Sequence, residues 1–170
     1  LQSSFSVNSI ALVKGRPQLL NLHDMVANFI EHRMEVVVRR TKYELKKAEE
    51  RAHILEGLII AVDNIDEVVK IIRASRTPAD AQTNLEERFG LDNLQSKAIV
   101  DMRLSQLTGL KIVELKKEYE ELQALIQHLN ALLASEVMRY EVIENELVEI
   151  KDKYADERRT RIIKMATEFN

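Results

Sequence analysis

The stretch Val38–Val62 reads VRRTKYELKKAEERAHILEGLIIAV, and its pattern decides the fold class. Small and apolar side chains recur there at alternating spacings of three and four residues, at Val38, Thr41, Leu45, Ala48, Ala52, Leu55, Ile59 and Val62. This spacing is typical of the seam of a coiled coil. Because the helical periodicity extends back to Asn21, the sequence predicts one helix over residues 21–62, roughly 60 Å long. A helix of that length predicts an extended arm rather than a compact domain.

A second seam follows Gly109 and predicts that the chain returns along the first helix. Its members are Leu115, Tyr119, Leu122, Ile126, Leu129 and Leu133. Ser135 is predicted to cap a further helix, so the returning part is interrupted once. In an antiparallel hairpin, position 62 then lies near position 110, and position 38 lies near position 134.

The distribution of charge favours the same pairing. Residues 33–47 carry six basic and two acidic side chains, whereas residues 118–149 carry eight acidic and one basic. Complementary charges beside the seam help to select the orientation of coiled-coil partners. The alternative is that the two stretches are unrelated solvated faces.

The region between the two seams contains several start and stop signals for short helices. Thr77 followed by Pro78 is the strongest start signal, because Thr caps helices and Pro is favoured at the first helical position. The predicted short helices cover residues 64–74, 77–90 and 92–107, and Thr108-Gly109 ends the last one. Gly57 is the one weak position in the long helix, since glycine is unfavourable in a helix interior.

The sequence therefore predicts a mainly α fold. It is a long antiparallel coiled-coil hairpin with a small helical globule at its tip and a short β-hairpin or extended segment at the N-terminus, around Lys14-Gly15. The predicted segments are residues 1–20 for the N-terminal part, 21–62 for the outgoing helix, 63–108 for the globule, 109–153 for the returning helices and 154–170 for an exit segment.

Composition excludes several classes of protein. The chain has 170 residues, no cysteine, only four Gly and two Pro, and a net charge of −3. The absence of cysteine excludes disulfide frameworks, thiolate zinc sites and thiol nucleophiles. No apolar run is long enough for a membrane span, and no signal peptide is recognisable. Because Leu1 is not an initiator, we expect a piece of a longer protein.

The chemistry-bearing residues form no recognisable catalytic or metal-binding motif. His23, His32, His53 and His128 lack metal-ligand spacing, and the glycines are too isolated for a phosphate-binding loop. The four tyrosines, at positions 43, 119, 140 and 154, are predicted to pack in seams or at a helix end. We therefore assign no catalytic residue and no metal ligand. The basic cluster with Arg33, Arg39 and Arg40 either contacts DNA phosphates or pairs with acidic side chains, and the sequence leaves both alternatives open.

Several long strings resemble one known family. They are RAHILEGL at 51–58, NIDEVV at 64–69, QSKAIVDMRLSQLTGL at 95–110 and DERRT at 156–160. Together with LQSSFSVNSIALVKGRP at the start, they closely resemble the A-subunit family of bacterial DNA gyrase, in the family's order and over essentially the whole chain. The alternatives are the homologous subunit of topoisomerase IV and a generic coiled-coil scaffold. A generic coiled coil has no need for His53 or Gly57, which favours the family.

The resemblance implies a role as part of a type IIA DNA topoisomerase, a cytoplasmic enzyme that passes one DNA duplex through another. ATP and Mg²⁺ would act through the partner B subunit, and this segment would need no cofactor of its own. Residues 1–20 would be the end of the preceding tower region, and the cleaving tyrosine would lie upstream. The family usually has Gly after the aromatic residue at 154, where this chain has Ala155.

The globule is predicted to be the exit gate, where two A subunits meet. A globule of this size cannot bury all of its apolar residues by itself, and an exposed apolar patch marks an interface. We therefore predict a two-fold homodimer through residues 63–108. The predicted interface residues are Leu91, Leu94, Ile99, Met102 and Leu104.

Overall fold

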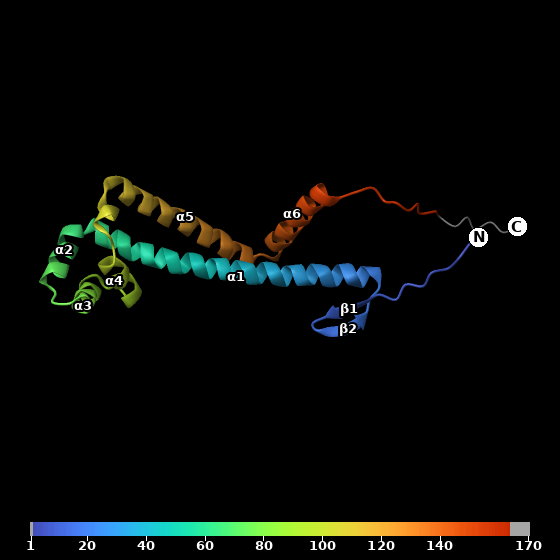
Figure 1. Ribbon diagram of the computed structural model, residues 1–170, viewed down its shortest axis with the longest axis horizontal. Coiled ribbons are helices and arrows are strands. Elements are labelled where there is room, and N and C mark those ends of the chain that lie inside the picture. The colour runs from blue at the N-terminus through green and yellow to red at the C-terminus, as the bar shows by residue number, and fades with distance from the viewer. Residues whose placement is uncertain (1, 164–170) are drawn as a thin grey trace.

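The computed structural model describes residues 2–163 and has an elongated, mainly α architecture (Figure 1). The elements are β1 (Ile10–Val13), β2 (Arg16–Leu19), α1 (Leu22–Asp63), α2 (Ile65–Ala74), α3 (Pro78–Phe89), α4 (Asn93–Val100), the 3₁₀ helix η1 (Leu104–Leu107), α5 (Gly109–Ala134) and α6 (Glu136–Tyr154). We call α1, α5 and α6 the arm and α2–η1 the tip. The hairpin β1–β2 lies at the opposite end of α1 from the tip, at the base of the arm.

Helix α1 confirms the predicted outgoing helix. It has 42 residues and therefore extends over about 63 Å. The Asn21 side chain caps it by accepting a hydrogen bond from the Asp24 N–H at 2.8 Å. Every predicted seam position is buried or half-buried, and the most buried are Thr41, Ala48, Ala52, Leu55 and Val62.

Helix α5 packs antiparallel to α1, as the seams predicted (Figure 1). Arg51 of α1 donates two hydrogen bonds to the Glu118 carboxylate of α5, at 2.8 and 3.1 Å. Lys116 of α5 is 2.9 Å from the Asp63 carboxylate. These pairs lie within about two helical turns of the predicted register, so the charged side chains beside the seam do connect the two helices.

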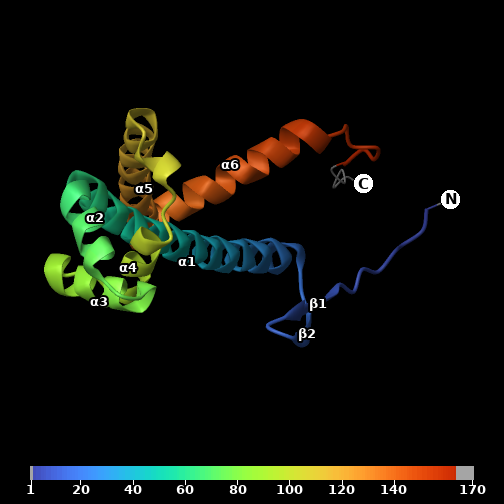
Figure 2. The same ribbon diagram turned by 60° about the vertical axis from the view of Figure 1, so that its left-hand side comes forward.

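The returning part of the arm is interrupted where Ser135 was predicted to cap a helix. Ser135 has an extended backbone, and its Oγ accepts a hydrogen bond from the Met138 N–H. Helix α6 then diverges from α1 towards the base of the arm (Figures 1 and 2). Arg139 bridges the interruption, because its Nη1 donates to the carbonyls of Leu132 and Leu133 at 3.1 and 2.6 Å. Both belong to the last turn of α5, where carbonyls lack helical partners.

We expect Arg139→Ala to lower the free energy of unfolding by about 2 kcal/mol, because two half-buried carbonyl bonds to a charged group are lost. Urea unfolding followed by circular dichroism measures the change. Arg76→Ala, at an exposed position in the loop before α3, is the control and should stay within about 0.5 kcal/mol of the wild type. Equal stability of the Arg139 variant and the control would contradict this role.

The N-terminal hairpin confirms the first alternative for this segment. β1 and β2 pair antiparallel, with Ile10 opposite Leu19 and Val13 opposite Arg16. The two turn residues, Lys14 and Gly15, have φ values of 51° and 77°. Two consecutive left-handed residues are what a tight two-residue hairpin turn requires.

The tip contains the expected helices, with two corrections. Thr77 caps α3 as predicted, and the helix predicted to end at 90 does so at a left-handed Gly90. Asp92 caps α4, which starts where the helix over 92–107 was predicted to start. Asn64, where the helix over 64–74 was predicted to start, makes no side-chain cap, and its amide instead donates to the Ile60 carbonyl at the end of α1. The predicted helix over 92–107 was also too long, because α4 ends at Val100 and a separate 3₁₀ turn precedes α5. No Gly or Pro lies at that break, so the predicted helix continued past it.

The helix end at Tyr154 shows how the chain forms this turn without glycine. Ala155 has φ −65° and ψ 135°, which is an extended conformation that any residue adopts. No helix within the described residues is long and apolar enough to cross a bilayer.

Candidate functional site

The tip is built around a core that it shares with the end of α1. Its buried members are Ala61, Val68, Leu85, Leu91 and Ile99. Leu91 and Ile99 were predicted to face a second chain, and both are buried within this chain. The physical reason is that α2, α3 and α4 fold around the last turns of α1, which supply the apolar surface that these small helices lack.

The other three predicted interface residues remain accessible to different degrees. Leu94 of α4 is 62% exposed and Leu104 of η1 is 83% exposed, whereas Met102 between them is half-buried. Leu94 shares its face of α4 with residues four and seven positions later, Ala98 and Asp101. The tip therefore presents two exposed leucines on adjacent elements.

A cavity of about 290 Å³ opens beside this surface. Its apolar lining comes from three different helices and the segment before η1, through Leu58, Val62, Ala98, Met102 and Leu115. Charged and polar side chains surround it, namely Arg51, Asp101, Arg103 and Gln106.

Helix α4 packs closely on α1 at Gly57, which is buried. A Cβ atom on Gly57 would lie 2.7 Å from the Cβ of Gln95. Gln95 itself is only 6% exposed, and its Nε2 donates to the carbonyl of His53 at 2.9 Å. The sequence marked Gly57 as a weak point of a helix, whereas the structure shows that it makes room for α4.

The side chain of His53 adds a second link between the same two helices. Its Nε2 is hydrogen-bonded to the carboxylate of Asp92, the residue that caps α4. The backbone N–H of Gln95 and, next, the bond from His53 hold the pKa of Asp92 below its ordinary value. The sequence showed only that His53 lacks the spacing of a metal ligand. Only the fold brings it to the start of a helix 39 positions later.

The basic cluster on α1 divides into two groups. Arg33 and Arg40 both donate to the carboxylate of Glu146 on α6. Arg39 lies between them in the sequence and is exposed. The sequence left open whether this cluster contacts DNA phosphates or pairs with acidic side chains. In the structure, Arg33 and Arg40 pair with an acidic side chain.

The bonds from Arg33 and Arg40 to Glu146 should make the contact between α1 and α6 depend on pH. Burial raises the pKa of Glu146, but the hydrogen bonds from Arg40 and Arg33 outweigh it and lower the pKa below its ordinary value. A carboxylate with a lowered pKa stabilises the fold above its unfolded pKa of about 4.3, and this stabilisation is lost as pH falls through the folded pKa. The contact between α1 and α6 should therefore weaken in acid.

We expect Glu146→Gln to be less stable than the wild type at pH 7 and equally stable once the pH is well below about 4. Unfolding free energies measured at a series of pH values give this difference directly. Glu149→Gln, an exposed position on the same helix, is the control and should change little with pH. A difference between wild type and Glu146→Gln that stays constant down to about pH 3 would contradict the assignment.

The tyrosines do not all pack as predicted. Tyr119 is half-buried, but Tyr43, Tyr140 and Tyr154 are largely exposed, so the packing prediction was wrong for these three. Lysines lie over two of the exposed rings, Lys47 over Tyr43 and Lys153 over Tyr154, at 5.9 and 5.1 Å from the ring centres. Residues 2–163 contain no group of three His, Asp or Glu side chains placed to hold a metal ion.

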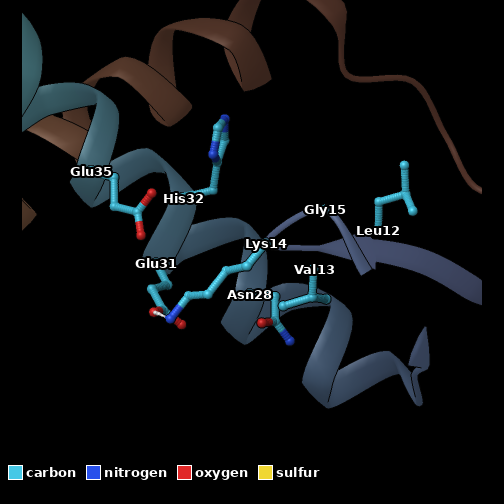
Figure 3. Close-up of a pocket in the computed structure, with 8 residues that line it drawn as sticks. All are labelled: Leu12, Val13, Lys14, Gly15, Asn28, Glu31, His32 and Glu35. Atoms are coloured by element: carbon cyan, nitrogen blue, oxygen red, sulfur yellow. Dashed lines mark ion pairs between the residues drawn. The ribbon is translucent and has the colours of Figure 1, made fainter. Parts of the chain in front are cut away.

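A cavity of about 320 Å³ lies where the β-hairpin meets α1 (Figure 3). Lys14 from the turn points towards Glu31 of α1, and their charged atoms are 3.4 Å apart. His32, on the same helix, points away from this pair in the close-up. The arrangement attaches the hairpin to the base of the arm and brings together no nucleophile with a base.

Comparison with known proteins identifies the family of this chain. The family model for the A subunit of DNA gyrase/topoisomerase IV matches residues 1–148. The DNA gyrase A subunit of Staphylococcus epidermidis is 51% identical over 162 residues, which are 95% of this chain and 18% of that protein. The DNA gyrase A subunit of Staphylococcus aureus is 50% identical over the same shares. The chain thus spans 18% of the length of these relatives. It belongs to the A-subunit family of DNA gyrase and topoisomerase IV.

Proposed function

We propose that this chain is the non-catalytic exit-gate arm of a bacterial type IIA DNA topoisomerase. In the parent enzyme, a DNA gyrase, two copies of the tip form a contact that opens to release the transported duplex. The parent enzyme uses ATP and Mg²⁺ through its B subunit, binds DNA and acts in the cytoplasm. The high identity to gyrase A subunits favours gyrase over topoisomerase IV and over an unrelated scaffold.

The observation that carries this proposal is the contrast between the arm and the tip. The seam positions of α1 and α5 are buried or half-buried against one another, so this face of the arm is used within one chain. The exposed apolar side chains of α5 are Leu110 and Val113, next to the tip, and Leu125. The tip exposes Leu94 and Leu104 beside an apolar cavity although it already has a complete core. An exposed leucine next to an apolar hollow gives the two halves of a self-complementary contact.

The length of the arm explains how a contact between tips could act as a gate. The tip lies about 60 Å from the hairpin at the base of the arm. Two copies joined at their tips would enclose a space between their arms, and separation of the tips would open that space. An interface that must open repeatedly should be of modest area, at or below the standard range of about 1,200–2,000 Å².

A role in contacting DNA is proposed for the basic cluster, and it falls chiefly on Arg39. Arg33 and Arg40 hold Glu146, so their charges are partly neutralised within the arm. The transported duplex would pass the exposed charge of Arg39, which would attract the DNA phosphates only briefly and in a salt-dependent way. This fits a segment that DNA must leave rather than one that retains it.

Sedimentation equilibrium of the chain between about 1 and 100 μM tests the proposal. We expect a monomer–dimer equilibrium in this range. In parallel, incubation with supercoiled plasmid, Mg²⁺ and ATP should leave the plasmid topology unchanged, since no described residues form a cleavage site. A strict monomer at about 100 μM would contradict the gate, and a DNA end linked to a tyrosine would contradict the non-catalytic assignment.

A further inference from the structure

We propose that Gln95 is the positioning residue of the gate: seated on Gly57 and bonded to the backbone of α1, it sets the orientation of α4, whose outer face carries Leu94. This inference rests on the proposed function, because it concerns the surface through which two copies would meet. Gly57 and Gln95 are both buried, so neither can contact a second chain directly. The role proposed for this pair in dimerisation is therefore indirect.

The two helices approach each other closely at this pair. Gly57 lies within α1 and has no positive φ, so backbone conformation gives no reason for a glycine there. Glycine is among the least favourable residues in a helix interior. The reason is space, because a Cβ atom would lie 2.7 Å from Cβ and 2.9 Å from Cγ of Gln95. Real Cβ atoms do not approach side-chain carbons so closely.

The side-chain amide of Gln95 is hydrogen-bonded at both ends. Its Nε2 donates to the His53 carbonyl at 2.9 Å, and its Oε1 accepts from the Asp92 N–H at 3.2 Å. The backbone N–H of Gln95 in turn donates to Asp92 Oδ1 at 2.9 Å. The same side chain therefore completes the capping box of α4 and ties that cap to α1. A buried amide with both ends bonded tolerates little displacement.

His53 links the same cap to α1 a second time. Its ring nitrogen Nε2 is bonded to the second carboxylate oxygen of Asp92. The cap of α4 is thus held from two sides by two parts of one α1 residue, its carbonyl oxygen and its ring. These bonds restrict rotation of α4 about its own axis, which packing of Leu91 and Ile99 alone would permit more readily.

Helix α4 transmits this attachment to the gate surface. Leu94 is the immediate neighbour of Gln95 and points outward, with 62% of its surface exposed. Helix α4 has only eight residues, so it moves as one body. Any shift that relieves a clash at Gly57 must therefore displace Leu94, which is exposed, and Ala98, which lines the neighbouring cavity.

The test compares Gly57→Ala with Gly109→Ala. Position 109 has no atom within 4 Å of an added Cβ, so its variant is the matched control. Dissociation constants of the dimer come from sedimentation equilibrium, and unfolding is followed on the same samples. We expect Gly57→Ala to weaken dimerisation at least tenfold, and Gly109→Ala to leave it within twofold of the wild type. If Gly57 were an ordinary helix glycine, alanine would instead stabilise α1 and leave dimerisation unchanged.

Should Gly57→Ala lose its helical signal, Gln95→Met decides, because it keeps the size and removes both amide bonds. We expect at least threefold weaker dimerisation with unchanged helix content, and unchanged dimerisation would overturn the proposal.

The outcomes separate this inference from the proposed function. A wild-type chain that is monomeric throughout contradicts the gate itself. A wild-type dimer whose affinity is the same in Gly57→Ala contradicts only the positioning role of Gln95.

Discussion

Leu85→Ala is expected to lower the free energy of unfolding of the tip by about 3 kcal/mol, within the range of about 2–5 kcal/mol for large-to-small changes in a core. Leu85 is 0% exposed and belongs to the cluster with Val68, Leu91 and Ile99. The helices around it have 8–12 residues and are too short to be stable alone. The cavity left by the truncation therefore weakens the contact that holds all three together.

Hydrogen exchange followed by mass spectrometry should show this loss in α2–α4 while residues 41–55 of α1 keep their protection. Leu22→Ala is the control, since the same truncation at a 78% exposed position at the base of the arm should cost less than about 0.5 kcal/mol. Equal exchange of α2–α4 in the Leu85 and Leu22 variants would contradict the shared core.

Leu104→Glu is expected to weaken dimerisation by about a hundredfold or more. Leu104 is 83% exposed, so a charge there costs the folded monomer little. In a two-fold dimer, each substitution occurs twice, and buried interface anchors contribute about 2 kcal/mol or more each. A glutamate would bring two like charges into the contact and leave them without water.

Leu22→Glu is the matched control for this experiment. Leu22 is 78% exposed, but it lies at the base of the arm. Its substitution should leave the dissociation constant within about twofold of the wild type. Loss of the dimer with Leu22→Glu but not with Leu104→Glu would place the interface at the base of the arm. That result would contradict an exit gate formed by the tips.

The arm could be predicted from the sequence because its signals are local and repeated. The alternation of three- and four-residue spacings from Val38 to Val62 determines which face of α1 is buried, and Asn21 and Ser135 determine where helices begin. Opposite charges beside the seams indicated the direction of pairing. Each of these signals acts within a few residues, so no knowledge of the tertiary fold was needed.

The tip could be predicted only in part, because its core depends on packing between distant segments. The caps at Thr77 and Asp92 located α3 and α4, but nothing local showed that Leu91 and Ile99 would pack on the end of α1. The end of α4 at Val100 has no Gly or Pro to mark it. The number of exposed apolar residues in the tip was therefore overestimated, because the end of α1 covers some of them.

The junction of arm and tip was recognisable in the sequence only as an anomaly. His53 and Gly57 have no use in a generic coiled coil, and the structure shows that both serve the contact with α4. Their partners Asp92 and Gln95 lie about forty residues away, which no periodicity connects. The glycine in the interior of the long helix was visible in the sequence, but only as a weak position and not as the site of a close helix crossing.

The central claim is that two copies meet at their tips with their bases apart, and a distance measurement between spin labels tests it most directly. The chain has no cysteine, so a single introduced cysteine gives one label per copy. The two positions are Glu87→Cys on α3 of the tip and His23→Cys at the start of α1, both exposed. Double electron–electron resonance on each dimer should give a shorter distance between the two labels at 87 than between the two labels at 23, because position 23 lies at the far end of an arm of about 60 Å from the proposed contact. A shorter distance at 23 than at 87, or equal distances at both, would contradict a gate formed by the tips.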